Sequence, residues 1–222
     1  MMIWNHFLKL LKPNGLMIDK NILFSYLDKN FSDAHCELNY SKDYELLIAI
    51  MLSSQTTDKA VNKVTALLFA KYPTLEQLKN ADIKDIENIL SSIGMYKVKA
   101  RNVIGIVTKI IDEYNGVVPQ DPNLLTALPG VGNKTKNCFL AEMYNYPLLA
   151  LDTHVQRISK RLKLVKKNDS LDVMEKKITK FIPSERLVKT NHQLIWFGRY
   201  FCKAKNPKCS ECELKQYCSK TN

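Results

Sequence analysis

The sequence lacks any long hydrophobic run. No stretch of about 18 consecutive apolar residues, the minimum for a membrane-spanning helix, occurs in its 222 residues. The N-terminal segment also lacks the pattern of a signal peptide, because Lys9, Lys12 and Pro13 interrupt residues 1–16. These absences argue against a membrane helix and against export. We therefore expect the protein to stay in the cytoplasm.

Strand-like alternation of apolar and polar residues is also missing, as are internal repeats and low-complexity tracts. Apolar residues instead recur at spacings of three and four, which is typical of amphipathic helices. The spacing predicts helices near residues 21–31, 44–52, 61–68, 83–93, 103–111, 155–163, 173–181 and 191–200. Short connections with Pro73, Gly94, Gly116 and Pro119 separate several of them. The sequence therefore predicts a compact all-α protein.

Two local expectations concern the N-terminal part of the chain. The first 20 residues have only a short apolar stripe, and we expect a helix or a loose arm there. This stripe consists of Trp4, Phe7, Leu8 and Leu11. Ser41 is the expected N-cap of the helix that ends at Leu52. That helix is apolar on most sides, so we expect it to be buried.

Acidic residues are scarce in the last third of the chain. Residues 1–154 contain 16 Lys and Arg against 16 Asp and Glu, whereas residues 155–222 contain 17 against 6. The whole formal charge of +11 therefore belongs to the C-terminal portion. A basic portion beside a neutral body favours an acidic partner such as nucleic acid, although a merely well-solvated basic surface would have the same composition.

Glycine is scarce too, with 7 residues in the chain, and two of them lie in one segment, Leu128-Pro129-Gly130-Val131-Gly132-Asn133-Lys134-Thr135. Residues 122–127 before it are expected to form a short helix, and another helix follows. Gly130 and Gly132 let the backbone turn tightly and approach a ligand, and the next helix offers free N–H groups to an anion. Alone, this pattern also fits an ordinary corner between two helices.

Four of the six cysteines are crowded at the C-terminus in the pattern Cys202-x6-Cys209-x2-Cys212-x5-Cys218. In a cytoplasmic chain such a group indicates metal ligands rather than disulfides. Four thiolates suit a tetrahedral zinc ion or a [4Fe–4S] cluster equally well. Cys36 and Cys138 have no such spacing, and we expect them to be buried thiols.

These motifs together resemble the endonuclease III family of helix-hairpin-helix DNA glycosylases. The resemblance rests on residues 128–137, on Leu151-Asp152-Thr153-His154 and on the cysteine pattern, and it runs from about Tyr40 to Cys218. It implies that Lys134 is the nucleophile and Asp152 the catalytic carboxylate, although Asp152 alone would read as a helix N-cap. It also implies a [4Fe–4S] cluster on the four cysteines, since a zinc ribbon usually has two Cys-x2-Cys pairs. His154 is expected to be a packing residue.

The resemblance further implies which residues contact DNA. Leu52-Ser53-Ser54-Gln55-Thr56-Thr57-Asp58 and Ile93-Gly94-Met95-Tyr96 resemble segments from which Gln55 and Met95 insert into the duplex. The family usually has a basic residue where Asn133 stands and a small one at Lys136, so Lys136 replaces that cation. Backbone and side-chain contacts to phosphates are expected from Gly130, Gly132, Lys136, Lys203, Lys205 and Lys208.

A lysine amine must be neutral to attack an electrophilic sugar carbon. Partial burial, the helix dipole and the nearby charge of Lys136 would favour the neutral amine of Lys134. A lysine at the start of a helix can equally be plain surface charge, and the family resemblance is what favours the nucleophile.

The fold implied by the resemblance is a helical barrel domain, residues 36–146, with its helix-hairpin-helix at about 122–144. Residues 1–35 and 147–222 would form a second helical domain with the cluster loop at 202–218. The implied protein is a monomeric glycosylase and AP lyase that removes oxidised pyrimidines from double-stranded DNA. Three alternatives are a monofunctional mismatch glycosylase, a non-catalytic DNA-binding module with a structural metal site, and an iron–sulfur redox sensor. The sequence leaves open the preferred lesion and any redox role of the cluster.

Overall fold

The computed structural model describes residues 18–220, which form two compact units and contain no β-strand. One unit is Cys36–Ala150, and the other combines the described residues up to His35 with those from Leu151 onward. The apolar stripe predicted at Trp4 to Leu11 lies outside the described residues. The two compact units meet in the chain between Ala150 and Leu151. The domain boundary expected at residue 146 stays a prediction. Leu149 remains tied to the first unit, since its carbonyl accepts a hydrogen bond from Asn137 Nδ2 at 2.9 Å.

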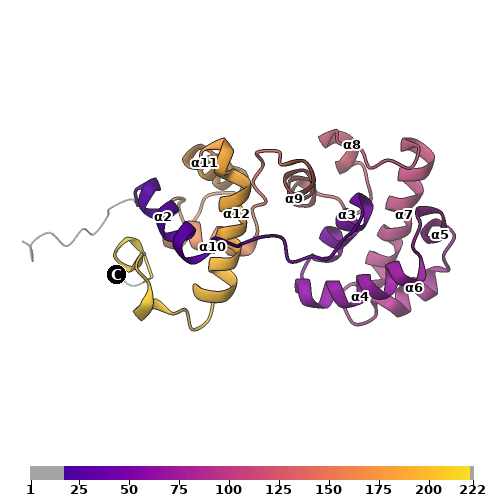
Figure 1. Cartoon of the computed structure of the whole chain (residues 1–222), viewed down its shortest axis with the longest axis horizontal. Helices are drawn as coiled ribbons and strands as arrows, with labels where there is room; N and C mark the ends of the chain where they lie inside the picture. The colour runs from indigo at the N-terminus through magenta and orange to yellow at the C-terminus, as the bar shows by residue number, and fades with distance from the viewer. Residues whose placement is uncertain (1–17, 221–222) are drawn as a thin grey trace, which may run out of the picture. The chain divides into compact units, whose positions relative to one another are not determined.

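The unit from Cys36 to Ala150 is built around one buried helix, α3. Nine of its ten side chains are buried, as the sequence predicted, and it packs against α4, α7 and α9 (Figure 1). Helices α5 and α6 cover another part of α7. The helices of this unit are α3 (Asp43–Leu52), α4 (Asp58–Lys71), α5 (Leu75–Lys79), α6 (Ile83–Leu90), α7 (Tyr96–Tyr114), α8 (Pro122–Thr126) and α9 (Asn133–Tyr144). Neither the apolar spacing nor the hairpin segment predicts the short helix α5.

The N-cap expected at Ser41 is wrong. Helix α3 begins one residue later than that cap would require, and its N-cap position is Lys42, which makes no side-chain cap. The backbone N–H and the hydroxyl of Ser41 instead donate to Glu45 Oε2, each at 2.8 Å. The side chain of Glu45 therefore folds back from the first turn of α3 and accepts both hydrogen bonds from Ser41. The hydroxyl that could have capped the helix is a donor to a buried carboxylate instead.

The other unit packs α10 and α2 against α12. Its helices are α2 (Lys20–Asn30), α10 (Thr153–Arg161), α11 (Leu171–Phe181) and α12 (Leu187–Trp196). The last predicted helix, 191–200, starts earlier than expected and ends differently. At Phe197–Phe201 the chain passes into a π-helical turn, in which Cys202 N–H donates to Phe197 O at 2.7 Å. The wider turn leads directly into the cysteine loop.

Candidate active site and iron–sulfur centre

The hairpin between α8 and α9 requires glycine at one position and leaves open space at the other. Gly130 has φ +74°, and a Cβ there would overlap the side-chain amide of Asn102 and lie 3.2 Å from Met51 Cγ. Gly132 has an ordinary φ of −93°, and a Cβ there would meet no atom within 4 Å. No atom of residues 18–220 therefore crowds Gly132, and its missing side chain leaves the start of α9 accessible to a ligand.

Helix α9 begins without a side-chain cap, because its N-cap residue is Gly132. The first N–H groups of a helix have no acceptor within the helix, and here they lie at the positive end of the helix dipole without a side-chain cap. Lys136 bends back over this turn, with its Nζ 3.4 Å from Asn133 Oδ1. Uncapped amides and a cation at one helix end make a site for a phosphate group.

Lys134 lies in the first turn of α9, and its side chain is exposed. The partial burial expected for this amine is therefore wrong for the free protein. Exposure follows from helix geometry, because Phe139 and Leu140 occupy the buried side of α9 while Lys134 falls on the opposite side. The amine is free to reach a substrate that approaches the hairpin.

Gln55 and Met95, the two residues expected to insert into DNA, share an uncommon backbone conformation. Gln55 has φ +54° and Met95 has φ +57°, although neither is glycine. Both side chains are exposed, and that of Met95 is 51% exposed despite being apolar. A left-handed backbone conformation costs a residue other than glycine about 1–2 kcal/mol. Strained backbone under exposed side chains is typical of functional loops.

Helix α7 supports both of these loops and the hairpin. The ammonium of Lys99, which is only 3% exposed, donates to Ser54 O at 2.9 Å and to Thr56 Oγ1 at 2.8 Å. Farther along the helix, a Cβ on Gly105 would lie 2.9 Å from Pro129 Cγ in the hairpin. No sequence motif assigns a role to Lys99 itself. A signal was present, since Lys99 lies four and seven residues before the buried Val103 and Ile106.

Asp152 is the N-cap of α10, as one of the two interpretations predicted. Its Oδ1 accepts a hydrogen bond from Val155 N–H at 2.8 Å. A carboxylate has two oxygens with two lone pairs each, so the cap leaves Oδ2 able to accept a proton or a further hydrogen bond. The half-buried side chain is thereby held in one orientation. The cap is compatible with a catalytic role.

His154 packs closely against the π-helical turn, in agreement with the expectation of a packing role. A Cβ on Gly198 would come within 2.7 Å of His154 Cβ. Its Nδ1 lies 3.1 Å from Arg157 Nη2, and the imidazole also forms a hydrogen bond with the backbone of Gly198. Burial lowers the pKa of His154, Asp152 opposes this change, and Arg157 adds to it. The neutral imidazole is therefore favoured.

The four C-terminal cysteines line one cavity, together with Phe201, Pro207, Lys208 and Lys215. Burial raises the pKa of the Cys212 thiol, and the other three sulfurs raise it further, so all four lie within electrostatic reach of one another. Among residues 18–220, no three His, Cys, Asp or Glu side chains converge closely enough to hold a single metal ion. The donor set, four thiols around one small cavity, fits a [4Fe–4S] cluster.

Two arginines of α10 bind the cysteine loop. Arg157 Nε donates to Cys202 O at 3.2 Å, and Arg161 Nη1 donates to Cys202 Sγ at 3.0 Å and to Lys203 O at 2.9 Å. These cations would compensate negative charge on a cluster and its thiolates. The three lysines that the sequence singled out around this loop, Lys203, Lys205 and Lys208, are exposed.

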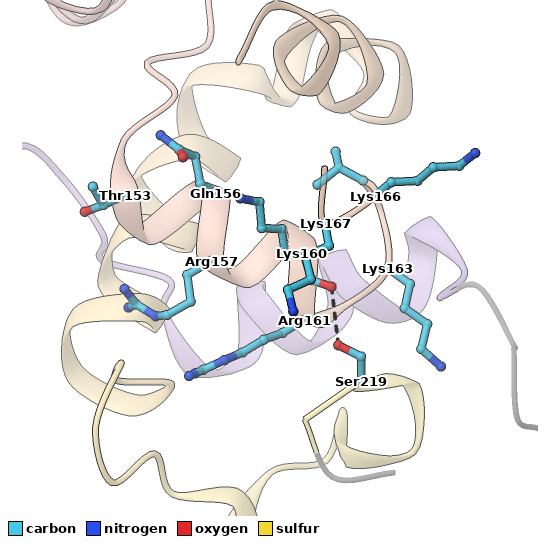
Figure 2. A pocket seen from close by; sticks show the side chains of 10 residues that line it. Thr153, Gln156, Arg157, Lys160, Arg161, Lys163, Lys166, Lys167 and Ser219 are labelled. Carbon is cyan, nitrogen blue, oxygen red and sulfur yellow. Dashed lines mark hydrogen bonds between the residues drawn. The ribbon is translucent and has the colours of Figure 1, made fainter. Parts of the chain in front are cut away.

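A basic hollow of about 860 Å³ lies on the same helix, between α10 and the segment that follows it. It is lined by Thr153, Gln156, Arg157, Lys160, Arg161, Lys163, Val165, Lys166, Lys167 and Ser219. Figure 2 shows Arg157 and Arg161 extending to one side, whereas Lys163 and Lys166 extend to the other. The hollow contains no carboxylate among its lining residues, so it presents positive charge to an anionic ligand.

Cys36 and Cys138 are half-buried rather than fully buried. Burial is the main reason that the pKa of the Cys36 thiol is raised to about 12, with smaller contributions from Glu142 and Cys138. A thiol with so high a pKa is a poor nucleophile. The expectation of buried thiols is therefore met only in part, since both side chains keep some exposure.

Comparison with known proteins identifies the family. Residues 48–184 match the HhH-GPD superfamily of base excision DNA repair proteins, and residues 202–218 match the iron–sulfur binding domain of endonuclease III. Endonuclease III of Bacillus subtilis (strain 168) is 43% identical, over 85% of this chain and 86% of that protein. Endonuclease III of Escherichia coli (strain K12) is 36% identical, over 88% of this chain and 92% of that protein.

Solved structures give the same relationship. A non-covalent endonuclease III–DNA complex has a TM-score of 0.88 and 43% identity, covering 92% of this chain and 97% of that one. A trapped covalent endonuclease III–DNA intermediate also has a TM-score of 0.88 and 43% identity, covering 92% and 98%. A thermostable thymine-DNA glycosylase, at 20% identity and a TM-score of 0.79, shares the fold. This chain therefore belongs to the endonuclease III family of helix-hairpin-helix base excision DNA repair proteins.

Proposed function

We propose that this chain is a DNA glycosylase with AP lyase activity that removes oxidised pyrimidines from double-stranded DNA. The observation that carries the proposal is the exposed amine of Lys134 beside the uncapped start of α9. Two endonuclease III structures similar to this chain are a DNA complex and a trapped covalent intermediate with DNA, and both describe those proteins. We infer the same partner here, bound by a monomer in the cytoplasm, on the nucleoid if the source is prokaryotic.

The reaction assigned to Lys134 is nucleophilic substitution at C1′ of the damaged nucleotide. The amine lone pair forms a C–N bond to C1′ and the glycosidic bond breaks. The base leaves with the electron pair of the glycosidic bond and takes up a proton. Opening of the sugar ring gives an iminium, and loss of a 2′ proton then expels the 3′ phosphate. A tertiary amine or a hydroxyl could not form this iminium, whereas the primary amine of Lys134 can.

Asp152 is assigned the role of proton acceptor and charge stabiliser. A carboxylate can take the proton that the attacking amine loses, and its charge stabilises the positive charge that develops on the sugar. The oxygen not used by the helix cap is available for this purpose. The hydrogen bond from Val155 N–H to Oδ1 fixes the Asp152 side chain in advance, so little reorganisation is needed during the reaction.

The remaining assigned residues hold the DNA. Amides at Gly130 and Gly132 and the cation of Lys136 bind phosphates, because the helix end is positive and uncapped. Gln55 and Met95 fill the space that an extruded nucleotide leaves, since both are exposed on loops whose backbone is fixed. Inserted side chains offset part of the cost of unstacking.

The cofactor is a [4Fe–4S] cluster, and the residues that would hold it are Cys202, Cys209, Cys212 and Cys218. When bound, the cluster supplies a rigid cross-link for a loop that has almost no core of its own. The loop then presents Lys203, Lys205 and Lys208 to phosphates as a fixed basic surface. Arg161 orients the loop through its bonds to Cys202 and Lys203.

Borohydride trapping on a duplex with one abasic site tests the proposal. The wild-type protein should be reduced onto the DNA as a covalent adduct, because borohydride reduces the iminium. Lys134→Gln should give no adduct and no strand cleavage while it still binds the duplex. Lys136→Gln is the matched control, since it removes a cation from the same turn and should weaken binding but keep trapping.

Each other result has a clear meaning. Adducts with Lys134→Gln would move the nucleophile elsewhere, with Lys136 tested next. Base release by the wild type without any adduct would identify a monofunctional glycosylase. If the wild-type protein neither releases a base nor forms an adduct, DNA binding alone would remain as its function.

A further inference from the structure

Lys99 is a buried lysine whose contacts are all inside the protein. Its side chain is 3% exposed, and its Nζ donates to Ser54 O and Thr56 Oγ1 at 2.9 and 2.8 Å. These acceptors belong to the residues immediately before and after Gln55. The ammonium thus bridges the ends of the short segment from which the exposed, left-handed Gln55 projects.

The backbone of Lys99 fixes the second loop. Its N–H donates to Met95 O at 3.0 Å, closing the first turn of α7 directly after the left-handed Met95. One residue therefore contacts both the Gln55 segment and the Met95 loop. Burial lowers the pKa of Lys99, so hydrogen bonding to the Gln55 loop is obtained at some cost in desolvation.

The same face of α7 also supports the hairpin. Asn102 and Gly105 follow Lys99 at spacings of three and six, and they lie against Gly130 and Pro129 respectively. Each step of three residues turns by only about 60° around a helix, so these positions follow one stripe along α7. The distance between the Gln55 segment and the hairpin that carries Lys134 is thereby set by three positions on one rigid helix.

We propose that Lys99 is a positioning residue for base extrusion, and that it acts by holding the Gln55 loop in the conformation that enters the duplex. This inference rests on the proposed function, because it concerns the same reaction. It differs from a role in catalysis at the sugar, since the ammonium is enclosed and faces Ser54 and Thr56 rather than the surface. The proposed role also differs from general stabilisation of the fold, because the hydrogen bonds of Lys99 act on the placement of one side chain, that of Gln55.

A double-mutant cycle between Lys99 and Gln55 tests the proposal. Lys99→Met keeps the length of the buried chain and removes the hydrogen bonds, and Gln55→Ala removes the inserted side chain. Two reactions are measured under single turnover: excision of thymine glycol from a duplex, and strand cleavage at an abasic site in single-stranded DNA. Only the first requires a base to be extruded from a stacked pair.

Each single variant should lower duplex excision by about tenfold, because a misplaced group of this kind costs one to two orders of magnitude. The double variant should be no slower than Gln55→Ala, within about twofold, since Lys99 would have nothing left to position. Cleavage of the single-stranded abasic substrate should change by less than about twofold in all of them. Lys109→Met is the matched control, because it removes the same charge from α7 at a site paired with Glu113. It should retain full activity.

Independent effects that multiply in the double variant would overturn the proposal, as would an equal loss on the single-stranded substrate. If Lys99→Met does not fold, Thr56→Val replaces it, because this variant keeps the ammonium and removes one acceptor. A loss of about threefold on the duplex alone, absent in the Gln55→Ala background, is expected. No loss with Thr56→Val would overturn the proposal. A wild-type protein inactive on both substrates would instead contradict the proposed function.

Discussion

Two exposed residues, Gln55 and Met95, keep side chains at backbone positions where glycine would be more stable. Glycine adopts positive φ readily, whereas other residues do so at a cost of about 1–2 kcal/mol. The side chains themselves must therefore contribute something that glycine lacks. Gly130 is the opposite case, because both its φ and its contact with Asn102 exclude any side chain. Residue identity at Gly130 follows from local geometry, and at Gln55 and Met95 it agrees with the proposed insertion into DNA.

A single substitution at Asp152 distinguishes a structural role of this residue from a catalytic one. Asn caps helices as well as Asp does, so Asp152→Asn should leave thermal stability and duplex binding nearly unchanged. Excision should nevertheless fall by roughly 10² or more, because an amide can neither accept the proton nor stabilise positive charge. Single-turnover excision and thermal unfolding, measured on the same preparation, check both parts.

Ser170→Ala is the matched control for that substitution. Ser170 caps α11 through Val173 N–H at 3.4 Å, and its loss should cost about 1 kcal/mol of stability with activity retained. Full activity in Asp152→Asn would reduce Asp152 to a helix cap.

At the scale of helices, α2 and α12 are joined by one carboxylate. Asp28 on α2 accepts from Arg186 Nη2 through both oxygens at 2.9 Å, from Lys189 at 2.9 Å and from Gln193 at 3.0 Å. Burial raises the pKa of Asp28, but the hydrogen bonds from Gln193, Lys189 and Arg186 outweigh it and lower the pKa to about 2. The contact holds α2, which is distant in sequence, against α12.

Acid should weaken this contact in a defined range. Because the folded pKa lies below the ordinary value of 3.8, the stabilisation is complete above about pH 4 and is lost as pH falls toward 2. Asp28→Asn should lower stability at pH 7 and reduce the steepness of the decline below pH 4. Urea unfolding at pH 7, 4 and 3 measures both effects. An acid limb as steep in Asp28→Asn as in the wild type would contradict the assignment.

At the scale of the whole molecule, the charge is divided unevenly along the chain. The excess of cations after residue 154 includes the hollow on α10 and the cysteine loop, whereas the earlier residues are electrically balanced. Binding that releases counterions from phosphates should therefore depend on the C-terminal portion. The helices of the described residues include none that could span a membrane.

Salt dependence of DNA affinity tests this division. With four to six neutralised phosphates, the slope of log K against log salt should be about −4 to −5. Lys203→Gln combined with Lys205→Gln should reduce the magnitude of the slope by about 1.8, since each phosphate contact contributes about 0.9. Lys176→Gln with Lys180→Gln on α11 is the matched control, and we expect no change in slope. Equal reductions in both pairs would show that only net charge matters.

The sequence by itself determined the features that depend on neighbours three or four residues apart. Apolar spacing determined the helices, Asp152 was identifiable as a cap, and the hairpin and cysteine spacing identified the family. Tertiary structure decided what depends on packing between distant segments. Lys99 reaches Ser54 across 45 residues, and the π-helical turn brings Cys202 to Arg161, 41 residues away in the sequence. No local pattern encodes these contacts, because a polar group in a core is stable only where packing supplies its partner.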